Sequence, residues 1–370
     1  MRFPEFTEEW KAEQLDNIAT LSKGIGISKE QLSEDGEPCI LYGELYTKYK
    51  SEIIKQVESK TDINGSKLKR SKANDVIIPC SGETAVDIAT ARCVPFDNIL
   101  FGGDLNVISL HQYDGAFMSY QLNGKRKYDI ARVAQGVSIV HLYGEHVKAI
   151  KTYNPTLPEQ QKIAKLLSLL DDRIDTQNKI IEDLKKLKSA ISERLFKSVK
   201  GFTVLLSDLC DIVKGKQING ENLSDSGNYY VMNGGTEPSG YYDNYNVEAS
   251  TISISEGGNS CGYVQFNTSP FWSGGHCYSI QNIADKVDNM YLYHYLKSNE
   301  DAVMKVRIGS GLPNIQKKDL AMFKIIVPKI EWQIKISTFL SSLERKAEIE
   351  ERIQNVMQKQ KLYLLQQMFI

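Results

Sequence analysis

A segment that occurs twice constrains this chain more than any other feature of its sequence. A shift of 173 residues carries Gly136 onto Gly309, Pro155 onto Pro328 and Phe196 onto Phe369. The other identities in this register are Lys151/Lys324, Gln160/Gln333, Lys162/Lys335, Ile163/Ile336, Leu167/Leu340, Ser168/Ser341, Leu170/Leu343, Lys186/Lys359 and Lys188/Lys361. No gap is needed, and so long a period indicates duplicated domains rather than a solenoid of short repeats.

Upstream of this segment the two copies share only short motifs. These motifs are Lys23-Gly24 with Lys214-Gly215, and Asp114-x-x-Phe117 with Asp288-x-x-Tyr291. The chain is therefore expected to contain a variable domain, a constant segment, a second variable domain and a second constant segment. We place their boundaries at residues 1–153, 154–199, 200–328 and 329–370.

The constant segments have the pattern of long helices that pair through a narrow seam. Glu159 to Lys197 contain no Gly or Pro, and Pro158 with an acidic first turn suits a helix start. Apolar residues recur at alternating steps of four and three, at Ile163, Leu167, Leu170, Ile174, Ile181, Leu184, Ile191 and Leu195. The second copy has Ile336, Leu340, Leu343, Ala347, Met357, Leu364 and Met368. These heptads predict a coiled coil.

Each helix of a coiled coil needs a partner helix. A homodimeric zipper is the more common use of a heptad helix, but the duplication offers a partner within the chain. Antiparallel pairing brings the end of the first helix close to the start of the second, so that the second variable domain bridges them without a long return path. We expect this arrangement, with an approximate two-fold repeat and the variable domains at opposite ends of the pair.

Two polar positions interrupt both copies of the seam. They are Gln177 with Glu350, and Lys188 with Lys361. Polar residues at such positions can set the register of a coiled coil, or they can lie at its solvent-facing edge. The sequence leaves both interpretations open.

The variable domains combine short β runs with Gly-rich loops and a little helix, which predicts an α/β (α+β) fold. The β runs are Val76–Ile78, Thr251–Ile254, Tyr263–Phe266 and Cys277–Ile280, and Asn289–Lys297 has helical spacing. The loops of the second domain are rich in Asn, Tyr and Gly, and their candidate DNA-contacting residues are Asn233, Tyr241, Tyr242, Asn259 and His276. Ordinary turn chemistry also explains any one of these loops.

The charge balance argues against a simple basic DNA-binding protein, because the net charge is −1. Positive charge is local instead. The candidate phosphate-contacting residues are Lys67, Lys69, Arg70, Lys72, Lys125, Arg126 and Arg132 in the first domain, and Lys214, Lys216, Arg307 and Ser310 in the second. Clusters of this kind serve either as solvated surface or as phosphate contacts.

The remaining composition excludes several classes of protein. Hydrophobic residues make up 41% and charged residues 25%, and no stretch is apolar enough for a membrane helix. The opening residues lack a signal-peptide core, and the six cysteines have no clustered spacing. We therefore expect a cytoplasmic protein with reduced thiols and no zinc site.

Catalytic motifs are missing as well. There is no GxxxxGK[ST] loop, no Asn/Asp-Pro-Pro-aromatic motif, and no HxH or HExxH spacing among the five histidines. For His276 we expect a hydrogen-bonding role rather than metal binding or catalysis. The sequence therefore predicts neither a catalytic residue nor a metal site.

The chain resembles the specificity subunits of type I restriction-modification enzymes. The resemblance covers the whole chain and rests on motifs in both copies: Arg2-Phe3-Pro4-Glu5-Phe6 with Trp10, Leu157-Pro158-Glu159-Gln160-Gln161-Lys162-Ile163-Ala164, Leu170-Asp171, Leu195-Phe196, Gln333-x-Lys335-Ile336 and Met368-Phe369. Ser81-Gly82-Glu83-Thr84-Ala85 resembles part of a target-recognition domain, which adds Ser81 and Thr84 to the candidate DNA contacts.

The resemblance implies two target-recognition domains separated by an antiparallel coiled coil. It implies a non-catalytic subunit that reads a bipartite double-stranded DNA target and positions two methyltransferase subunits and the restriction subunits on it. No cofactor is expected in this chain, with S-adenosylmethionine and ATP with Mg²⁺ expected on the partner subunits. Two alternatives remain: the reader part of a fused restriction–methylation enzyme, and a structural coiled-coil adaptor without a DNA role.

Overall fold

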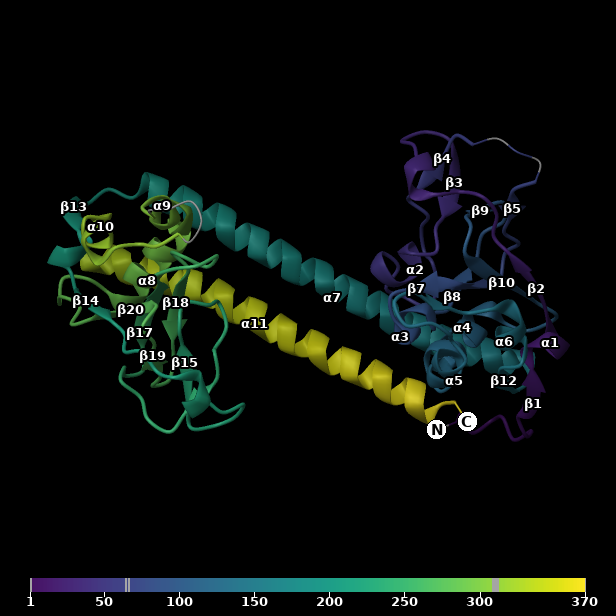
Figure 1. Ribbon diagram of the computed structural model, residues 1–370. Coiled ribbons are helices and arrows are strands. Elements are labelled where there is room, and N and C mark those ends of the chain that lie inside the picture. The colour runs from purple at the N-terminus through teal and green to yellow at the C-terminus, as the bar shows by residue number, and fades with distance from the viewer. Residues whose placement is uncertain (1, 64, 66, 308–312, 370) are drawn as a thin grey trace. The chain divides into compact units, whose positions relative to one another are not determined.

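The computed structural model describes residues 2–63, 65, 67–307 and 313–369. It divides into two compact units, unit 1 with Met1–Lys179 and Arg352–Ile370, and unit 2 with Ile180–Glu351. Each unit contains one recognition domain and part of the helices α7 (Leu157–Ser198) and α11 (Ile330–Gln367), as Figure 1 shows.

The recognition domain of unit 1 is built on a four-stranded antiparallel sheet of order β2-β10-β6-β8. Its strands are β2 (Ala19–Lys23), β10 (Leu105–Leu110), β6 (Asp75–Pro79) and β8 (Arg92–Val94). A second sheet has the order β4-β3-β9-β5, with β4 (Lys60–Thr61), β3 (Glu37–Ile40), β9 (Leu100–Phe101) and β5 (Lys69–Arg70). Two pairs complete the strands: β1 (Lys11–Gln14) with β12 (Lys151–Asn154), and β7 (Ser81–Gly82) with β11 (Val140–His141).

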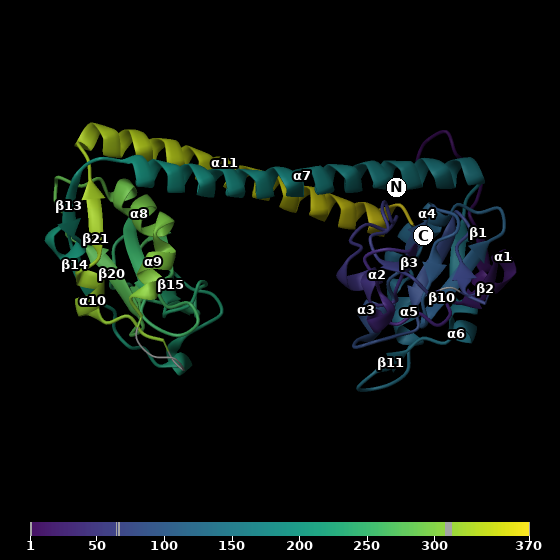
Figure 2. The same ribbon diagram turned by 90° about the horizontal axis from the view of Figure 1, so that it is seen from above.

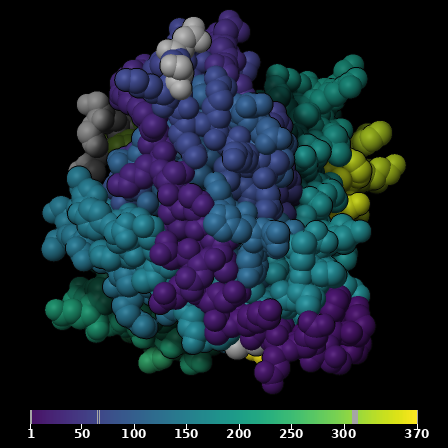
Figure 3. Space-filling model, turned by 90° about the vertical axis from the view of Figure 1, so that its right-hand side faces the viewer, coloured from purple at the N-terminus to yellow at the C-terminus, as the bar shows by residue number. Residues whose placement is uncertain are grey.

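Short helices close the faces of this domain. They are α1 (Leu15–Ile18), α2 (Glu44–Thr47), α3 (Ala85–Ile88), α4 (Gly115–Asn123), α5 (Lys127–Arg132) and α6 (Gly144–Lys148). Figure 3 shows the N-terminal segment crossing the surface of unit 1. Arg2 of this segment forms a bidentate ion pair with the buried Glu159 near the start of α7, and both hydrogen bonds are 2.7 Å long.

The recognition domain of unit 2 repeats the four-stranded sheet and the strand pair next to the long helix, and it has a smaller second sheet. Its four-stranded sheet has the order β14-β20-β17-β18, with β14 (Asp211–Lys214), β20 (Cys277–Gln281), β17 (Thr251–Ser255) and β18 (Val264–Asn267). The smaller sheets are β16-β15-β19, with β16 (Tyr241–Tyr242), β15 (Tyr229–Met232) and β19 (Trp272–Ser273), and the pair of β13 (Phe202–Leu205) and β21 (Lys324–Val327). The helices are α8 (Asn289–Ser298), α9 (Glu300–Lys305) and α10 (Lys317–Ala321).

The β runs identified in the sequence form the inner strands. Every residue of β6 and of β17 is buried, because both lie in the middle of their sheets and both faces are covered. The predicted strands over Tyr263–Phe266 and Cys277–Ile280 and the predicted helix over Asn289–Lys297 are confirmed by β18, β20 and α8.

One hydrogen-bonded clamp joins each recognition domain to the start of its long helix. In unit 1 the Gln160 side-chain oxygen accepts from the Asp114 backbone N–H at 2.9 Å, and its amide donates to the Pro155 carbonyl at 2.8 Å. Asp114 caps α4 by accepting from the Phe117 N–H at 2.7 Å. This network explains why Asp114, Pro155 and Gln160 all recur in the repeat.

Unit 2 contains the same clamp. The Gln333 side chain accepts from the Asp288 N–H at 2.8 Å and donates to the Pro328 carbonyl at 2.9 Å. Asp288 caps α8 through the Tyr291 N–H at 2.7 Å. Both glutamines are buried, and their amide groups are satisfied by backbone partners. The Gln333 amide also donates to the Lys286 carbonyl at 3.0 Å.

Within each unit α7 and α11 lie side by side and run antiparallel (Figure 2). In unit 1 Asp171 pairs with Lys361 and Asn178 with Gln354, so the numbering of α11 falls as that of α7 rises. In unit 2 Lys188 pairs with Glu344 at 2.6 Å. The predicted fold of two recognition domains and an antiparallel helix pair is confirmed.

The predicted seam residues lie between the helices or against the domains. Ile163, Leu167, Ile174, Ile181, Ile336, Leu340 and Met368 are buried, and Leu170, Leu184, Ile191, Leu195, Leu343, Met357 and Leu364 are half-buried. The polar seam positions are also enclosed. The Lys361 ammonium lies 2.5 Å from Glu52 and 2.6 Å from Asp171, with its side chain only 15% exposed. These contacts favour the register role over the solvent-edge role.

No helix within the described ranges is long and apolar enough to span a membrane. All six cysteines have free, buried thiols.

We predict that Gln160→Leu lowers the free energy of unfolding by about 1–3 kcal/mol for each backbone group left without a partner, the Asp114 N–H and the Pro155 carbonyl. The neighbouring Gln161 is exposed and provides the matched control Gln161→Leu, which should stay close to wild type. Urea unfolding measures both variants, and equal losses would contradict the clamp.

A second prediction concerns pH. Burial lowers the pKa of His294 from 6.5 to about 4, while its Nε2 atom lies 2.9 Å from the Ser341 hydroxyl. Between these two pH values the unfolded chain binds a proton that the folded chain does not, so the free energy of unfolding falls as the pH falls. The loss amounts to about 3 kcal/mol.

The change His294→Gln keeps a hydrogen-bonding group for Ser341 and removes this titration. We expect urea unfolding to show a smaller loss of stability between pH 7 and pH 4 for His294→Gln than for wild type. Parallel pH profiles would show that His294 does not carry this effect.

Candidate nucleic-acid interface

The basic segment of residues 67–72 lies on and around an edge strand of unit 1. Lys69 and Arg70 form β5, which pairs with β9 at one side of the small sheet, and Lys67 and Lys72 are exposed on either side. Arg70 donates to both carboxylate oxygens of Glu37, at 2.5 and 2.9 Å. This pairing raises the pKa of Arg70 and lowers that of Glu37. The positive charge of the segment therefore comes mainly from its lysines.

The second predicted cluster of unit 1 lies elsewhere. Arg126 pairs with Asp129 at 3.1 Å and stacks over the Tyr153 ring at 5.2 Å, and Arg132 lies 3.8 Å from the same Asp129. Lys125 is exposed beside them. Figure 1 shows β5 and α5 at opposite ends of unit 1, so the structure does not bring the two clusters together.

Ser81 and Thr84 have local structural roles. The buried Ser81 hydroxyl donates to the Asp104 carboxylate at 3.1 Å. Thr84 is the N-cap of α3 and accepts from the Asp87 N–H at 3.1 Å. Asp104 is exposed and was not a candidate from the sequence, because a lone aspartate in a Gly-rich turn has no distinguishing pattern.

In unit 2 two predicted residues lie against a buried carboxylate, and a third predicted residue holds the backbone of one of them. Glu256 accepts from the Lys214 ammonium at 2.6 Å, and its second oxygen lies 3.8 Å from Nδ1 of His276. Asn233 accepts from the His276 backbone N–H at 3.1 Å. The Tyr278 hydroxyl also donates to Glu256, at 2.9 Å, and burial raises the pKa of this tyrosine.

Glu256 was missed by the sequence analysis. Its Oε2 atom is buried and has no hydrogen-bond partner among the residues that the structure describes. The signal in the sequence is only that a glutamate ends the run Thr251–Ser255 before two glycines. The His276 side chain is 60% exposed above this carboxylate, so Glu256 holds its Nδ1 side while the rest of the ring faces solvent.

The other candidates of unit 2 lie on neighbouring loops. The Lys216 carbonyl accepts from the Trp272 indole at 3.0 Å, and this ring meets Tyr242 at 5.1 Å. Tyr241 and Tyr242 form β16 and are half-buried, and Asn259 and Arg307 are exposed. Ser310 lies outside the described residues.

The chemistry available at these sites is binding. Among the described residues no group of three or more His, Cys, Asp or Glu side chains could hold a metal ion. Burial raises the pKa of Cys277 and of Cys80 to about 11, so both thiols are protonated at neutral pH and are weak nucleophiles. Exposed Lys, His, Asn and Asp side chains on Gly-rich turns suit hydrogen bonding to phosphates and base edges.

The architecture defines the chain as a protein with two copies of one recognition fold, each attached to a constant helix. Residues 7–186 and 201–359 match the family model described as the type I restriction modification DNA specificity domain. The chain belongs to this family.

Individual relatives agree with this assignment. Two proteins provisionally named type I specificity subunits, from Mycoplasma genitalium and Mycoplasma pneumoniae, are 32% and 31% identical over 122 and 145 residues. The alignments cover 32% and 39% of this chain, and the chain spans only 31% and 38% of the length of these relatives. The type I restriction enzyme MjaVIII specificity subunit of Methanocaldococcus jannaschii is 23% identical, over 96% of this chain and 90% of its own.

Solved structures share the fold. The type I restriction-modification S subunit from M. genitalium has a TM-score of 0.70 at 19% identity, covering 100% of this chain and 97% of that chain. The similarity confirms the arrangement of two mixed α/β domains with long helices.

We predict that replacing Lys67, Lys69 and Lys72 together by alanine weakens binding to all duplexes alike, because these side chains would contact phosphates. The triple change should also lower the salt slope, which is the steepness with which the logarithm of the binding constant falls with the logarithm of the salt concentration. Arg70→Ala is the matched control, and it should change the slope less because Glu37 already pairs with Arg70. Fluorescence titrations of random-sequence duplexes at several salt concentrations measure the slopes. A loss restricted to particular sequences would mean that these lysines contact bases instead.

Proposed function

We propose that this chain is the DNA-binding specificity subunit of a type I restriction-modification system. In this proposal each recognition domain reads one half of a bipartite double-stranded target. The observation that carries it is the duplication of one recognition fold within a chain of the DNA specificity family. A single-site reader has no need of a second domain with the same topology and different loops.

The subunit does no chemistry of its own. It positions two methyltransferase subunits, which bring S-adenosylmethionine, and restriction subunits, which bring ATP and Mg²⁺. Free buried thiols and the DNA target are consistent with action in the cytoplasm. In this proposal the partner subunits also contact the DNA and supply the rest of the positive surface, which accounts for the net charge of −1 of this chain.

Exposed apolar side chains on the long helices support the existence of protein partners. Val356 of α11 is 65% exposed. In unit 1 the other exposed apolar residues of the helices are Leu157, Leu166, Leu169, Ile353, Leu362 and Tyr363. Apolar surface of this extent on a helix is typical of a protein-binding face.

Domain exchange tests the proposal. Replacing residues 200–328 by the corresponding domain of another specificity subunit should change one half of the methylated sequence and leave the other half intact. Sequencing of methylated bases in host DNA provides the measurement. A change in both halves would contradict independent reading, and methyl transfer by the purified chain without partners would contradict a non-catalytic subunit.

A further inference from the structure

The two recognition domains share one backbone frame, although their sequences differ there. Four backbone hydrogen bonds at one end of the strands of the four-stranded sheet occur in both units. In unit 1 they are Gly24 N to Leu105 O, Gly102 N to Ile40 O, Cys80 N to Asp104 O and Leu142 N to Cys80 O, at 2.9, 3.0, 2.7 and 2.7 Å. In unit 2 they are Gly215 N to Cys277 O, Gly274 N to Met232 O, Glu256 N to His276 O and Ile315 N to Glu256 O, at 2.8, 2.8, 2.9 and 2.8 Å.

Glycine is required where the loops of this frame cross. A Cβ atom on Gly24 would lie 1.9 Å from the Gly102 carbonyl oxygen. In unit 2 a Cβ atom on Gly215 would lie 2.2 Å from the Gly274 carbonyl oxygen. No side chain fits at such distances. We call this arrangement, Gly24 with Gly102 and Gly215 with Gly274, the glycine frame.

The hydrogen-bond register of the strands shows which residue of unit 2 takes the place of each unit 1 residue on the glycine frame. Lys23 ends β2 as Lys214 ends β14, so a lysine occupies this position in both units. Asp104 directly precedes β10 as His276 directly precedes β20, so this exposed position differs. The pairing of β3 with β9 and of β15 with β19 also matches Leu41 with Asn233 and Tyr42 with Gly234.

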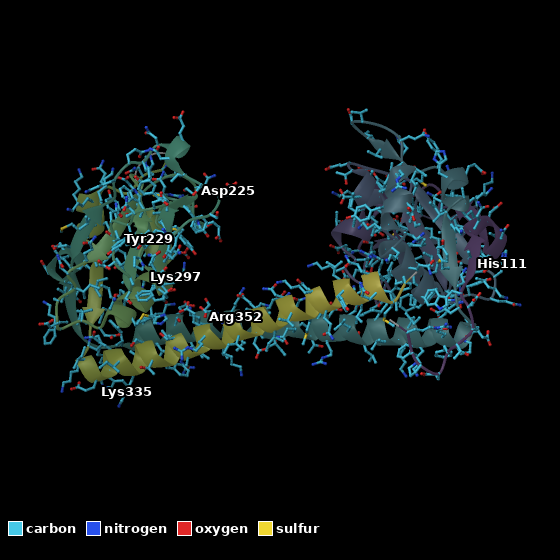
Figure 4. All side chains as sticks on the ribbon, turned by 90° about the horizontal axis from the view of Figure 1, so that it is seen from below. His111, Asp225, Tyr229, Lys297, Lys335 and Arg352 are labelled. Atoms are coloured by element: carbon cyan, nitrogen blue, oxygen red, sulfur yellow. The ribbon has the colours of Figure 1, made fainter. Side chains whose placement is uncertain are left out.

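Each variable side chain is held in place by its neighbours. The Ser81 hydroxyl donates to Asp104, which lies beside a cavity of about 870 Å³ that is also lined by Tyr42 and Gly103. His276 is held through its backbone by Asn233 and faces the buried Glu256. Figure 4 shows Tyr229, which lies on the strand that leads to Asn233, farther from the long helices α7 and α11 than Lys297 of α8.

A constant lysine and a variable polar side chain on one rigid frame correspond to the two kinds of contact that DNA offers. Phosphates are the same in every sequence, whereas base edges differ. We infer that the glycine frame is the DNA-reading edge of each recognition domain. Lys23 holds a phosphate, and Asp104 and His276 contact base edges. Lys214 takes the position of Lys23 in unit 2, where it also pairs with Glu256. This inference rests on the proposed function.

The chemistry of the two readers differs. A carboxylate accepts hydrogen bonds, so in the major groove Asp104 selects cytosine or adenine, whose exocyclic amino groups lie there. The Nδ1 atom of His276 lies 3.8 Å from Glu256, so its Nε2 atom is the one that contacts a base. When Nε2 carries the proton it donates, and it then suits the N7 or O6 acceptor of a purine edge. The two halves of the target are therefore read by different groups on the same backbone.

Selection from a pool of random duplexes tests the inference, with the full chain assembled with its methyltransferase subunits. The variants are Asp104→Asn, His276→Gln and Lys23→Ala. Asparagine suits the backbone at position 104, where φ is 58°. Lys23 is chosen over Lys214 because Lys214 also holds Glu256. Lys151→Ala is the control, since this exposed lysine recurs as Lys324 but lies off the frame.

Wild type should enrich two sequence blocks with an unread gap. We expect Asp104→Asn to change the preferred bases of one block only and His276→Gln those of the other only. Lys23→Ala should keep both blocks and lower the salt slope by about 1, whereas Lys151→Ala should leave the slope unchanged. Thermal melting at the wild-type temperature establishes that each variant is folded.

The outcomes separate this inference from the proposed function. Two unchanged blocks with both Asp104→Asn and His276→Gln would overturn the assignment of the frame and leave the specificity subunit standing. Equal changes in both blocks with either variant would also overturn it. If wild type enriches no bipartite sequence, the proposed function fails and the inference fails with it.

Discussion

A buried glutamine amide determines how each recognition domain is attached to its helix. Gln160 and Gln333 are the fourth residues of their helices, and each bridges the N-cap aspartate of a domain helix and the proline carbonyl before the long helix. An amide has one acceptor and one donor group, and both are used in a fixed direction. A charged or apolar side chain could not satisfy both backbone groups, so the orientation of domain and helix depends on this residue.

The helix pair carries a second polar constraint. Lys361 with Asp171 in unit 1 and Lys188 with Glu344 in unit 2 are the same contact in the two halves of the repeat. Because removing one partner of an enclosed ion pair leaves an unpaired buried charge, a slipped register costs several kcal/mol. The apolar seam alone would tolerate a slip of one heptad. The paired charges therefore select one register from several that the apolar residues allow.

Much of the fold could be predicted because its signals are local or periodic. The heptad pattern predicted the long helices, and the apolar run Val76–Ile78 predicted the central strand β6. The smaller sheets could not be predicted, because strands such as β5 and β9 contain two residues each and form only through contacts distant in sequence. The roles of Asp114 and Gln160 were also hidden, since the repeat marked both residues without showing that they touch.

The charge density of the sequence does not distinguish free charges from paired ones. It selected Arg70 and Arg126, which pair with nearby acids, and passed over Lys23 and Asp104, which lie on the glycine frame. The glycine frame becomes apparent only when the residues of the two units are aligned by the register of their strands. Its physical consequence is a division of labour, because Gly24 and Gly215 cannot change without a clash with backbone atoms, whereas the exposed His276 can change at little cost in stability. Asp104, at a φ of 58°, can change to residues such as asparagine that adopt this conformation. A domain built this way can acquire a new target without refolding.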